Sequence, residues 1–267
     1  MPDTSGSLKR HAAAAACLVL VFAARSHAQS PAPTPPSPDF LSRYDFHLTA
    51  NALTSADPRF SWDAHYGGDL DIVDYVAGRA SILADYEAVL GNELRPFDPN
   101  QAYYVLEASS SYRLGGTEIA GVFHHVSRHL SDRPKTYAIA WNVAGARVMR
   151  RFGFGGITVD GRADAGAVVQ HSSVDYKWTA DLDLWIRRAL TPRVGVFVHG
   201  YGEMFGVDGT LGNRPSQTGG RAEAGVRFNG RAGALELFAG VERRIDAVPA
   251  PLLAERWGIA GFRLLSK

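Results

Sequence analysis

The chain has 267 residues, with 28 lysines and arginines against 27 aspartates and glutamates, and a formal net charge of +1 at pH 7. This length suits one large domain or two small ones. The balanced charge, without a long basic cluster, gives no support to nucleic acid as a partner, and we expect none.

The N-terminal segment has the pattern of a secretory signal peptide. Lys9 and Arg10 precede an apolar run, residues 12–24, that is too short to span a bilayer, which needs ~20 residues. Small residues at Ser26 and Ala28 suit a signal peptidase, so we predict cleavage after Ala28. The alternative is a buried helix at the N-terminus.

The residues that follow predict a flexible lead into the folded part. Residues 29–42 include the proline-rich stretch PAPTPPSP, which is typical of an extended tether. The single cysteine, Cys17, lies inside the predicted signal peptide, so the mature chain can form neither a disulfide nor a thiolate site. We therefore divide the chain into a signal peptide (1–28), a tether (29–42) and a folded domain (43–267).

Alternation of apolar and polar residues with a period of two recurs along the folded part, which is the pattern of β-strands with two different faces. In KWTADLDLWIR, residues 177–187, Trp178 and Leu182 fall on one face, and Asp181 and Asp183 fall on the other. Twelve segments show such patterns, at about 44–54, 59–73, 76–90, 101–114, 116–130, 137–150, 155–171, 175–190, 193–206, 218–229, 233–245 and 254–265.

The number and length of these segments predict an all-β fold, an antiparallel transmembrane β-barrel of about 12 strands. They are longer than the ~5–6 residue strands of globular proteins and suit tilted membrane strands, which need ~9–11 residues in the bilayer. Compact connections such as Gly115-Gly116 mostly alternate with longer ones such as residues 206–217, which puts both chain ends in the periplasm. The competing fold is a secreted soluble barrel or sandwich with its apolar face inside.

The whole mature chain resembles bacterial outer-membrane β-barrels, although Lys267 stands where those proteins usually end on an aromatic residue. The resemblance implies location in the bacterial outer membrane, with its lipids around the protein and the barrel-assembly machinery as a partner during biogenesis. The sequence leaves the oligomeric state open.

The polar faces predict a lumen in which charges of both signs are interleaved. The predicted lumen acids from the seventh to the eleventh strand are Asp160, Asp164, Asp181, Asp183, Glu203, Glu223, Glu236 and Glu242, and the bases are Arg162, Lys177, Arg187, Arg193, Arg221, Arg227 and Arg244. A pore selective for one sign of ion would be lined mainly by the opposite charge. The mixture favours a narrow or salt-bridge-filled lumen. His199, Tyr201 and Glu203 also point inward, as lumen packing or as a ligand-binding set.

The stretch GVFHHVSRHLSDRP, residues 121–134, gathers polar residues at the outer end of the fifth predicted strand. Alternation puts His125, Ser127 and His129 on one face, but both faces mix polar and apolar residues, so either could meet lipid. His125 and His129 have Cα atoms ~13 Å apart on a strand. This is too far for two ligands of one zinc ion, so we expect no metal site here.

The spacing H-x-S at the outer end of a barrel strand resembles two families of outer-membrane lipid hydrolases, the lipid A 3-O-deacylases and the outer-membrane phospholipases A. The resemblance implies that His125 is a general base, that Ser127 is a nucleophile, and that an acidic or amide residue on the next strand completes the site. Asn142 is the nearest candidate, and Asp132 is a weaker one. Those families commonly have Asn after the serine, where this chain has Arg128.

The same stretch is also similar to a family of bacterial outer-membrane proteins without an assigned activity, which carries a motif close to H-x-S-S-H-L-G-D and an upstream A-D-P-R. The shared positions are His125, Ser127, His129, Leu130 and Asp132, with Ala56 to Arg59 upstream, while Arg128 and Ser131 depart from it. This resemblance implies a barrel and leaves the chemistry open.

Two functions follow from the sequence. The first is an envelope protein with a narrow or filled lumen and a structural, transport or binding role, in which His129 and Asp132 belong to a polar strand tip or a ligand site. The second is a lipid hydrolase that uses His125, Ser127 and Asn142 near the outer leaflet. We expect no cofactor for the first function, and the second would add calcium as a candidate. A hydrolase requires the histidine–serine pair to face lipid.

Overall fold

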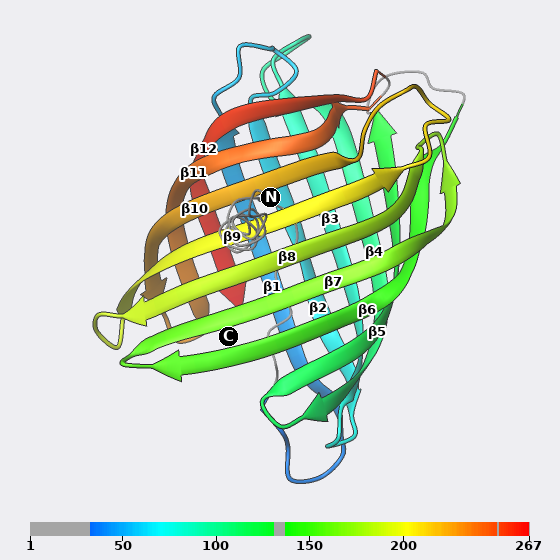
Figure 1. Cartoon of the computed structure of the whole chain (residues 1–267). Coiled ribbons are helices and arrows are strands. Elements are labelled where there is room, and N and C mark those ends of the chain that lie inside the picture. The colour runs from blue at the N-terminus through cyan, green and yellow to red at the C-terminus, as the bar shows by residue number, and fades with distance from the viewer. Residues whose placement is uncertain (1–32, 131–136, 250, 267) are drawn as a thin grey trace, which may run out of the picture.

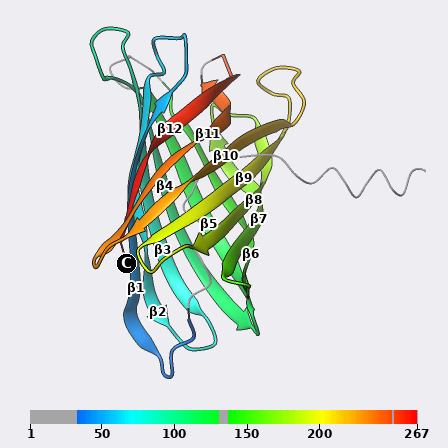
Figure 2. The same cartoon turned by 90° about the vertical axis from the view of Figure 1, so that its left-hand side faces the viewer.

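The computed structural model describes residues 33–130, 137–249 and 251–266. Within these ranges the chain forms twelve antiparallel strands in chain order, and β1 pairs with β12 to close the barrel (Figures 1 and 2). The strands are β1 (Asp39–Leu53), β2 (Trp62–Asp74), β3 (Arg79–Gly91), β4 (Asp98–Leu114), β5 (Thr117–Leu130), β6 (Ile139–Phe154), β7 (Ile157–Ser172), β8 (Tyr176–Ala189), β9 (Val194–Val207), β10 (Gln217–Asn229), β11 (Gly233–Val248) and β12 (Leu253–Ser266).

The predicted fold class is confirmed, since each of the twelve predicted segments corresponds to a strand. β1 begins at Asp39, inside the range 29–42 that the sequence assigns to a tether. The predicted signal peptide and the first residues of the predicted tether lie outside the described residues. In the described part of the chain, no helix has the length and apolar character needed to cross a membrane.

The connections differ between the two rims of the barrel. At one rim β6 turns into β7 through Gly155 and Gly156, whose φ angles of 54° and 78° suit glycine in a tight hairpin. At the other rim residues 54–61 and 208–216 form longer connections, which lie at the upper end in Figures 1 and 2. Short turns mark the periplasmic rim of such barrels and longer loops mark the outer rim. The start of β1 and the end of β12 therefore lie at the periplasmic rim.

Alternate residues of each strand point away from the lumen and form the outer wall. These outward residues are mainly apolar. On β4, Leu106 and Leu114 are 56% and 54% exposed, whereas Glu107 and Ser111 on the other face are buried. A soluble barrel would bury its apolar residues inside and expose the charged ones. The reverse arrangement, with apolar residues outside and charges inside, is that of a membrane-spanning barrel.

A network of guanidinium and carboxylate groups fills the lumen. Glu236 is fully buried and accepts hydrogen bonds from Arg227 at 2.8 Å and Arg263 at 2.7 Å. Arg263 also donates to Glu223 at 2.6 Å, and Glu223 accepts from Arg221 at 2.7 Å. These bonds join β10, β11 and β12 through their inner faces and agree with the predicted salt-bridge-filled lumen.

Two of the predicted lumen bases lie elsewhere. A register shift between Tyr176 and Trp178 at the start of β8 leaves Lys177 exposed. Arg193 is exposed in the turn between β8 and β9. Alternation assigns faces correctly only where the strand is regular, and both residues lie where that regularity ends.

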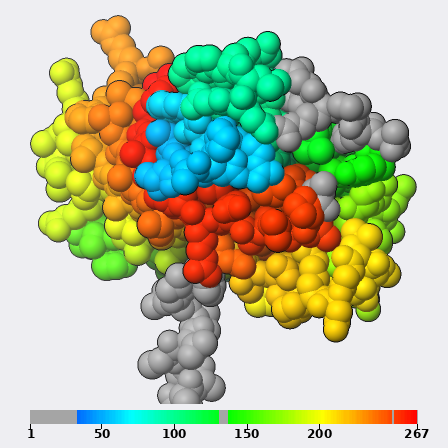
Figure 3. Space-filling model, turned by 90° about the horizontal axis from the view of Figure 1, so that it is seen from above, coloured from blue at the N-terminus to red at the C-terminus, as the bar shows by residue number. Residues whose placement is uncertain are grey.

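Side chains from the outer connections close the outer mouth. Phe60, between β1 and β2, is 1% exposed and packs on Trp257 with ring centroids 5.2 Å apart. Arg214, between β9 and β10, donates hydrogen bonds to Asp175 and Asp246, which raise the pKa of its guanidinium. Seen from above, the light-blue residues of the β1–β2 connection lie in the middle of this rim (Figure 3). These contacts of the described residues narrow the outer mouth of the barrel.

Replacing Glu236 with alanine tests the stabilising role of the lumen network. The change leaves Arg227 and Arg263 without this buried partner, and loss of one member of a buried ion pair costs about 3–5 kcal/mol. We expect a correspondingly lower free energy of unfolding, measured by urea unfolding of the refolded barrel in detergent micelles. Arg231→Ala, at an exposed turn residue, is the control and should leave the unfolding midpoint unchanged. Equal midpoints for Glu236→Ala and wild type would contradict the prediction.

Candidate active site

The polar motif of the sequence lies near the outer end of β5, and alternation sends its members to opposite faces. His125, Ser127 and His129 lie on the outer face, in line with Phe123, which is 47% exposed. Arg128 lies on the inner face and is buried. The structure therefore answers the question that the sequence left open, because the histidine–serine pair faces lipid.

A hydrogen-bonded chain crosses three strands beside Ser127. His125 on β5 lies opposite Asn142 on β6, which lies opposite Gln170 on β7. The Asn142 carbonyl oxygen Oδ1 accepts a hydrogen bond from His125 Nδ1 at 2.6 Å, and Asn142 Nδ2 donates to Gln170 Oε1 at 2.9 Å. An amide oxygen only accepts, so Nδ1 carries the proton and Nε2 of the neutral imidazole is left as the basic nitrogen.

Ser127 lies between two imidazoles on one strand face, since His125 precedes it by two positions and His129 follows it by two. Its Oγ forms a hydrogen bond with His129 Nε2 at 2.9 Å. Among the described residues, His125 makes its side-chain hydrogen bond only to Asn142, and its Nε2 has no partner. Rotation about the Cα–Cβ bond of Ser127 is the motion that would turn its hydroxyl from one imidazole toward the other.

A row of tyrosines shows the level of the site in the membrane. Tyr66, Tyr86 and Tyr104 are direct cross-strand partners, and Tyr104 in turn lies opposite Ser127. Adjacent tyrosine rings have centroids 4.9 Å apart, and the His129 ring contacts Tyr104 edge-on at 5.2 Å. Aromatic girdles of membrane barrels lie at the boundary between acyl chains and headgroups. Ser127 therefore lies at the outer boundary of the apolar band.

Arg128, which departs from both family patterns, fixes β5 from inside the barrel. Its guanidinium lies over Tyr103 at 4.9 Å and over Trp141 at 5.1 Å from the ring centroids. Its Nη1 also donates to the backbone carbonyl of Asp246 at 3.1 Å. The arginine does not take part in the outer-face chemistry, because it projects to the opposite side of the sheet.

The other predicted ligand residues are spread over different places. His199 is held between Asp183 at 3.0 Å and Glu223 at 3.3 Å, and it stacks on Trp185 with centroids 3.9 Å apart. It therefore belongs to the lumen packing. Asp132 lies outside the described residues.

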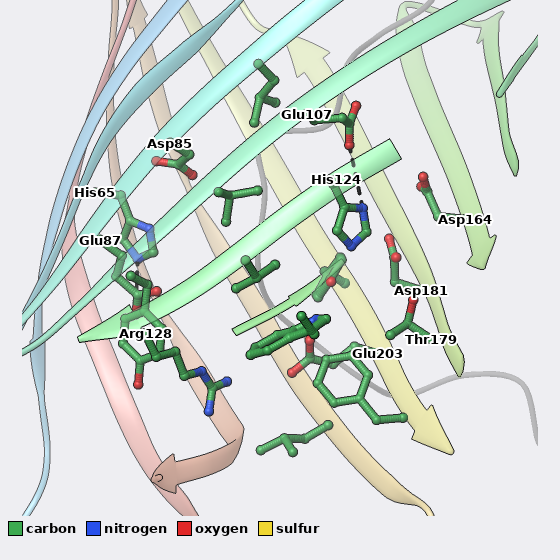
Figure 4. Close-up of a pocket in the computed structure, with 18 of the residues that line it drawn as sticks. His65, Asp85, Glu87, Glu107, His124, Arg128, Asp164, Thr179, Asp181 and Glu203 are labelled. Carbon is green, nitrogen blue, oxygen red and sulfur yellow. Dashed lines mark ion pairs between the residues drawn. The ribbon is translucent and has the colours of Figure 1, made fainter. Parts of the chain in front are cut away.

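Tyr201 and Glu203 help to line a lumen cavity of about 130 Å³, a volume that holds a few water molecules. In Figure 4, His124 points toward Glu107, with Nδ1 and Oε2 4.0 Å apart, while Asp164, Asp181 and Glu203 approach from other strands. Ligand pockets for small molecules are usually larger, at about 300–1,000 Å³. The cavity is thus smaller than a usual ligand pocket.

Sequence reasoning missed a compact group beside this cavity. Asp63, His65 and Glu87 offer ligand atoms that lie within 4.8 Å of one another. The Arg244 guanidinium contacts this group, however, at 2.6 Å from Asp63 and 2.8 Å from Glu87. A positive charge thus already neutralises the carboxylates, and the group belongs to the lumen network. The alternation on β2 placed Asp63 and His65 on one face, but only the strand register shows that Glu87 and Arg244 meet them.

These features define the class of the protein. A closed barrel of twelve antiparallel strands with an apolar exterior and a charge-filled lumen is the architecture of proteins of the bacterial outer membrane, and this is where the chain resides.

No known protein-family model matches the sequence, and no curated protein matches it. The similarity to the uncharacterised outer-membrane family therefore stays a prediction. Among solved structures, outer membrane phospholipase A from Escherichia coli is similar, with a TM-score of 0.51 at 12% identity over 82% of this chain and 92% of that one. An active-site mutant of the same enzyme, in which asparagine is replaced by alanine, gives a TM-score of 0.50 at 12% identity over 84% of this chain and 91% of that one.

The outer membrane phospholipase dimer of Salmonella typhi with bound calcium also gives a TM-score of 0.50, at 11% identity over 82% of this chain and 90% of that one. At these identities the similarity concerns the fold.

The outward position of Ser127 predicts how a label attached there will behave. The predicted mature chain, residues 29–267, contains no cysteine, so Ser127→Cys and Val126→Cys each introduce a single labelling site. We expect a fluorophore on position 127 to be strongly quenched by nitroxide-bearing lipids in vesicles. Position 126, on the lumen side, is the matched control and should resist labelling or quenching. Equal quenching at the two positions, or stronger quenching at 126, would contradict the assignment of faces.

Proposed function

We propose that the protein is an outer-membrane lipid hydrolase that cleaves an ester bond. Ser127 is the nucleophile, His125 is the general base, and Asn142 is the positioning residue for the imidazole. The observation that carries the proposal is the 2.6 Å hydrogen bond between His125 and Asn142 on the lipid side of the wall, two residues from Ser127. A nucleophile, a base and a third group that orients the base form the general arrangement of serine hydrolases.

The reaction follows from the position of the protons. His125 Nε2 accepts the hydroxyl proton of Ser127 as Oγ attacks the carbonyl carbon of the ester. The tetrahedral intermediate collapses, the carbon–oxygen bond to the alcohol breaks, and the imidazolium returns its proton to the alcohol oxygen. Water then attacks the acyl-serine with the same base, which releases the fatty acid and restores Ser127. The bond to Asn142 keeps Nδ1 protonated in both the neutral and the charged imidazole, so Nε2 is the nitrogen that takes up and returns the proton.

The level of Ser127 in the membrane supports a lipid as the substrate. Ester groups of membrane lipids lie between the headgroups and the acyl chains, which is the level marked by the row Tyr66, Tyr86 and Tyr104. A lipid that diffuses along the outer wall can thus present its ester to Ser127 without leaving the membrane. A soluble ester would have to enter the bilayer boundary first.

Calcium stays a prediction for this site. Calcium takes six to eight oxygen ligands, usually with carboxylates among them. The side chains of Asn142 and Gln170 place amide oxygens beside His125. The proposal assigns the proton transfers to the side chains, and the assay below compares calcium with a chelator.

An envelope role without catalysis is the second candidate, and the filled lumen is the observation that favours it. The buried ion pairs around Glu223 and Glu236, together with the closed mouth, give a rigid barrel whose interior leaves little room for a solute. Hydrolysis of lipid distinguishes the two functions, because a purely structural barrel would release no fatty acid.

The hydrolase proposal predicts that three substitutions reduce the release of fatty acid to different extents. The assay offers phospholipid and lipopolysaccharide to the refolded protein and measures released fatty acid, with calcium or with a chelator. Ser127→Ala should abolish release, and His125→Ala should reduce it by about 10³-fold or more. Asn142→Ala should reduce the rate less than His125→Ala does, since it removes only the orientation of the base.

His129→Ala is the control that separates the two imidazoles. His129 forms a hydrogen bond with Ser127 in the structure, but the proposal assigns the base to His125, so we expect this variant to retain most of the activity. Loss of activity in His129→Ala with full activity in His125→Ala would overturn the assignment of the base. Undiminished release by Ser127→Ala, or none from folded wild type, would overturn the hydrolase itself.

A further inference from the structure

Two arginines lie side by side on the outer face of the wall, far around the barrel from Ser127. Arg243 on β11 and Arg256 on β12 are direct cross-strand partners. Their chain neighbours Glu242 and Trp257 point into the lumen and are buried, so the two arginines point outward. Arg243 comes two residues beyond Val241, which is 62% exposed on the same face. The pair therefore lies where the apolar band ends at the outer rim.

The electrostatics of this pair is unfavourable without an anion. Side chains directly opposite each other have Cβ atoms about 4.5–5.5 Å apart, and like charges there destabilise the sheet. Neither Arg243 nor Arg256 forms an ion pair with any other described residue, whereas the lumen arginines Arg227, Arg244 and Arg263 are paired. Within the same described ranges, Arg243 Nη1 is buried and has no acceptor. A buried donor without an acceptor is costly, and this cost favours a rotamer in which Arg243 turns outward to an acceptor.

Residues with small or no side chains lie beside Arg243 and Arg256 on the outer face. The cross-strand row continues from Arg243 to Gly220 on β10 and Gly202 on β9. The next row toward the periplasm continues from Val241 to Ala222 and Gly200. Gly220 is buried beside Arg243, while Gly200, Gly202 and Ala222 are partly or fully exposed and present at most a methyl group to the membrane. A Cβ atom on Gly200 would meet nothing within 4 Å, so the packing of the sheet does not require glycine there.

We propose that Arg243 and Arg256 bind the phosphate of a phosphorylated glycolipid of the outer leaflet, with an acyl chain lying on the floor formed by Gly200, Gly202 and Ala222. Guanidinium groups donate paired hydrogen bonds to phosphate oxygens, which suits two arginines that share one anion. The phosphate neutralises both cations, and it accepts hydrogen bonds from exposed Arg256 and from Arg243 when that side chain turns outward. The site is independent of the proposed hydrolysis, since Ser127 lies on β5.

The test measures lipid A retained by the full refolded chain. The protein is incubated with lipid A that carries its phosphates, with dephosphorylated lipid A, or with inorganic phosphate as competitor, and bound lipid is quantified by mass spectrometry. The variant is Arg243→Gln with Arg256→Gln. The matched control is Arg150→Gln with Arg188→Gln, which replaces two exposed arginines near the periplasmic rim. Heat-dependent migration on gels reports whether each variant has folded.

We expect the double variant to bind phosphorylated lipid A about tenfold or more weakly than wild type, with the control unchanged. Dephosphorylated lipid A should bind wild type as weakly as the variant binds the phosphorylated form. Gly200→Leu, which fills the floor and keeps both arginines, should also weaken retention. Equal retention by wild type and the arginine variant would overturn the proposal, as would equal binding of the two lipid A forms. Displacement of the lipid by millimolar inorganic phosphate would overturn the role of the floor.

Discussion

The whole structure depends on the pairing of guanidinium and carboxylate groups inside the barrel. Twelve strands can carry this many charges through a membrane only because each strand turns its charged face inward and finds opposite charges there. Arg263 illustrates the principle, since it lies between Glu223 and Glu236 at 2.6 and 2.7 Å. An ionised group in a water-poor interior is tolerated when it is paired and hydrogen-bonded, and it is costly when it is not.

The proposed chemistry lies on the outer wall of the barrel and not in its lumen. Ion pairs fill the lumen, and Phe60 and Arg214 pack at its outer mouth. The wall is rigid because its inner face is cross-linked, and a rigid strand holds side chains such as His125 and Asn142 at fixed positions. Catalytic groups need that kind of support from the scaffold.

The sequence was sufficient to predict the strands. It was insufficient to predict which side chains contact one another across neighbouring strands. Alternation predicted twelve segments, because a residue period of two survives wherever a strand is regular. It placed Lys177 wrongly, because the register shift at Tyr176 breaks that period. The face of β5 stayed open in the sequence, since His124 and His125 are equally polar. Only the pairing of β5 with β4 and β6 assigns His125 to lipid.

Contacts between distant segments could not be predicted either, because they also depend on how the strands pair. The resemblance to lipid hydrolases named Asn142, but its contact with His125 depends on the hairpin register, which the sequence does not fix. The bond between Ser127 and His129 depends on a rotamer. The pair Arg243 and Arg256 comes together through the register of β11 and β12, although the two residues are separated by a turn.

The proposed hydrolysis requires Ser127 to be an activated nucleophile on the lipid side of the barrel. The most direct measurement is covalent labelling of the refolded protein by a long-chain fluorophosphonate, followed by mass spectrometry of the peptides. We predict a single adduct on Ser127 whose formation slows strongly in His125→Ala, because the reagent reports activation of the serine itself. A folded barrel that acquires no adduct at Ser127, or that is labelled there at the same rate without His125, would contradict the account.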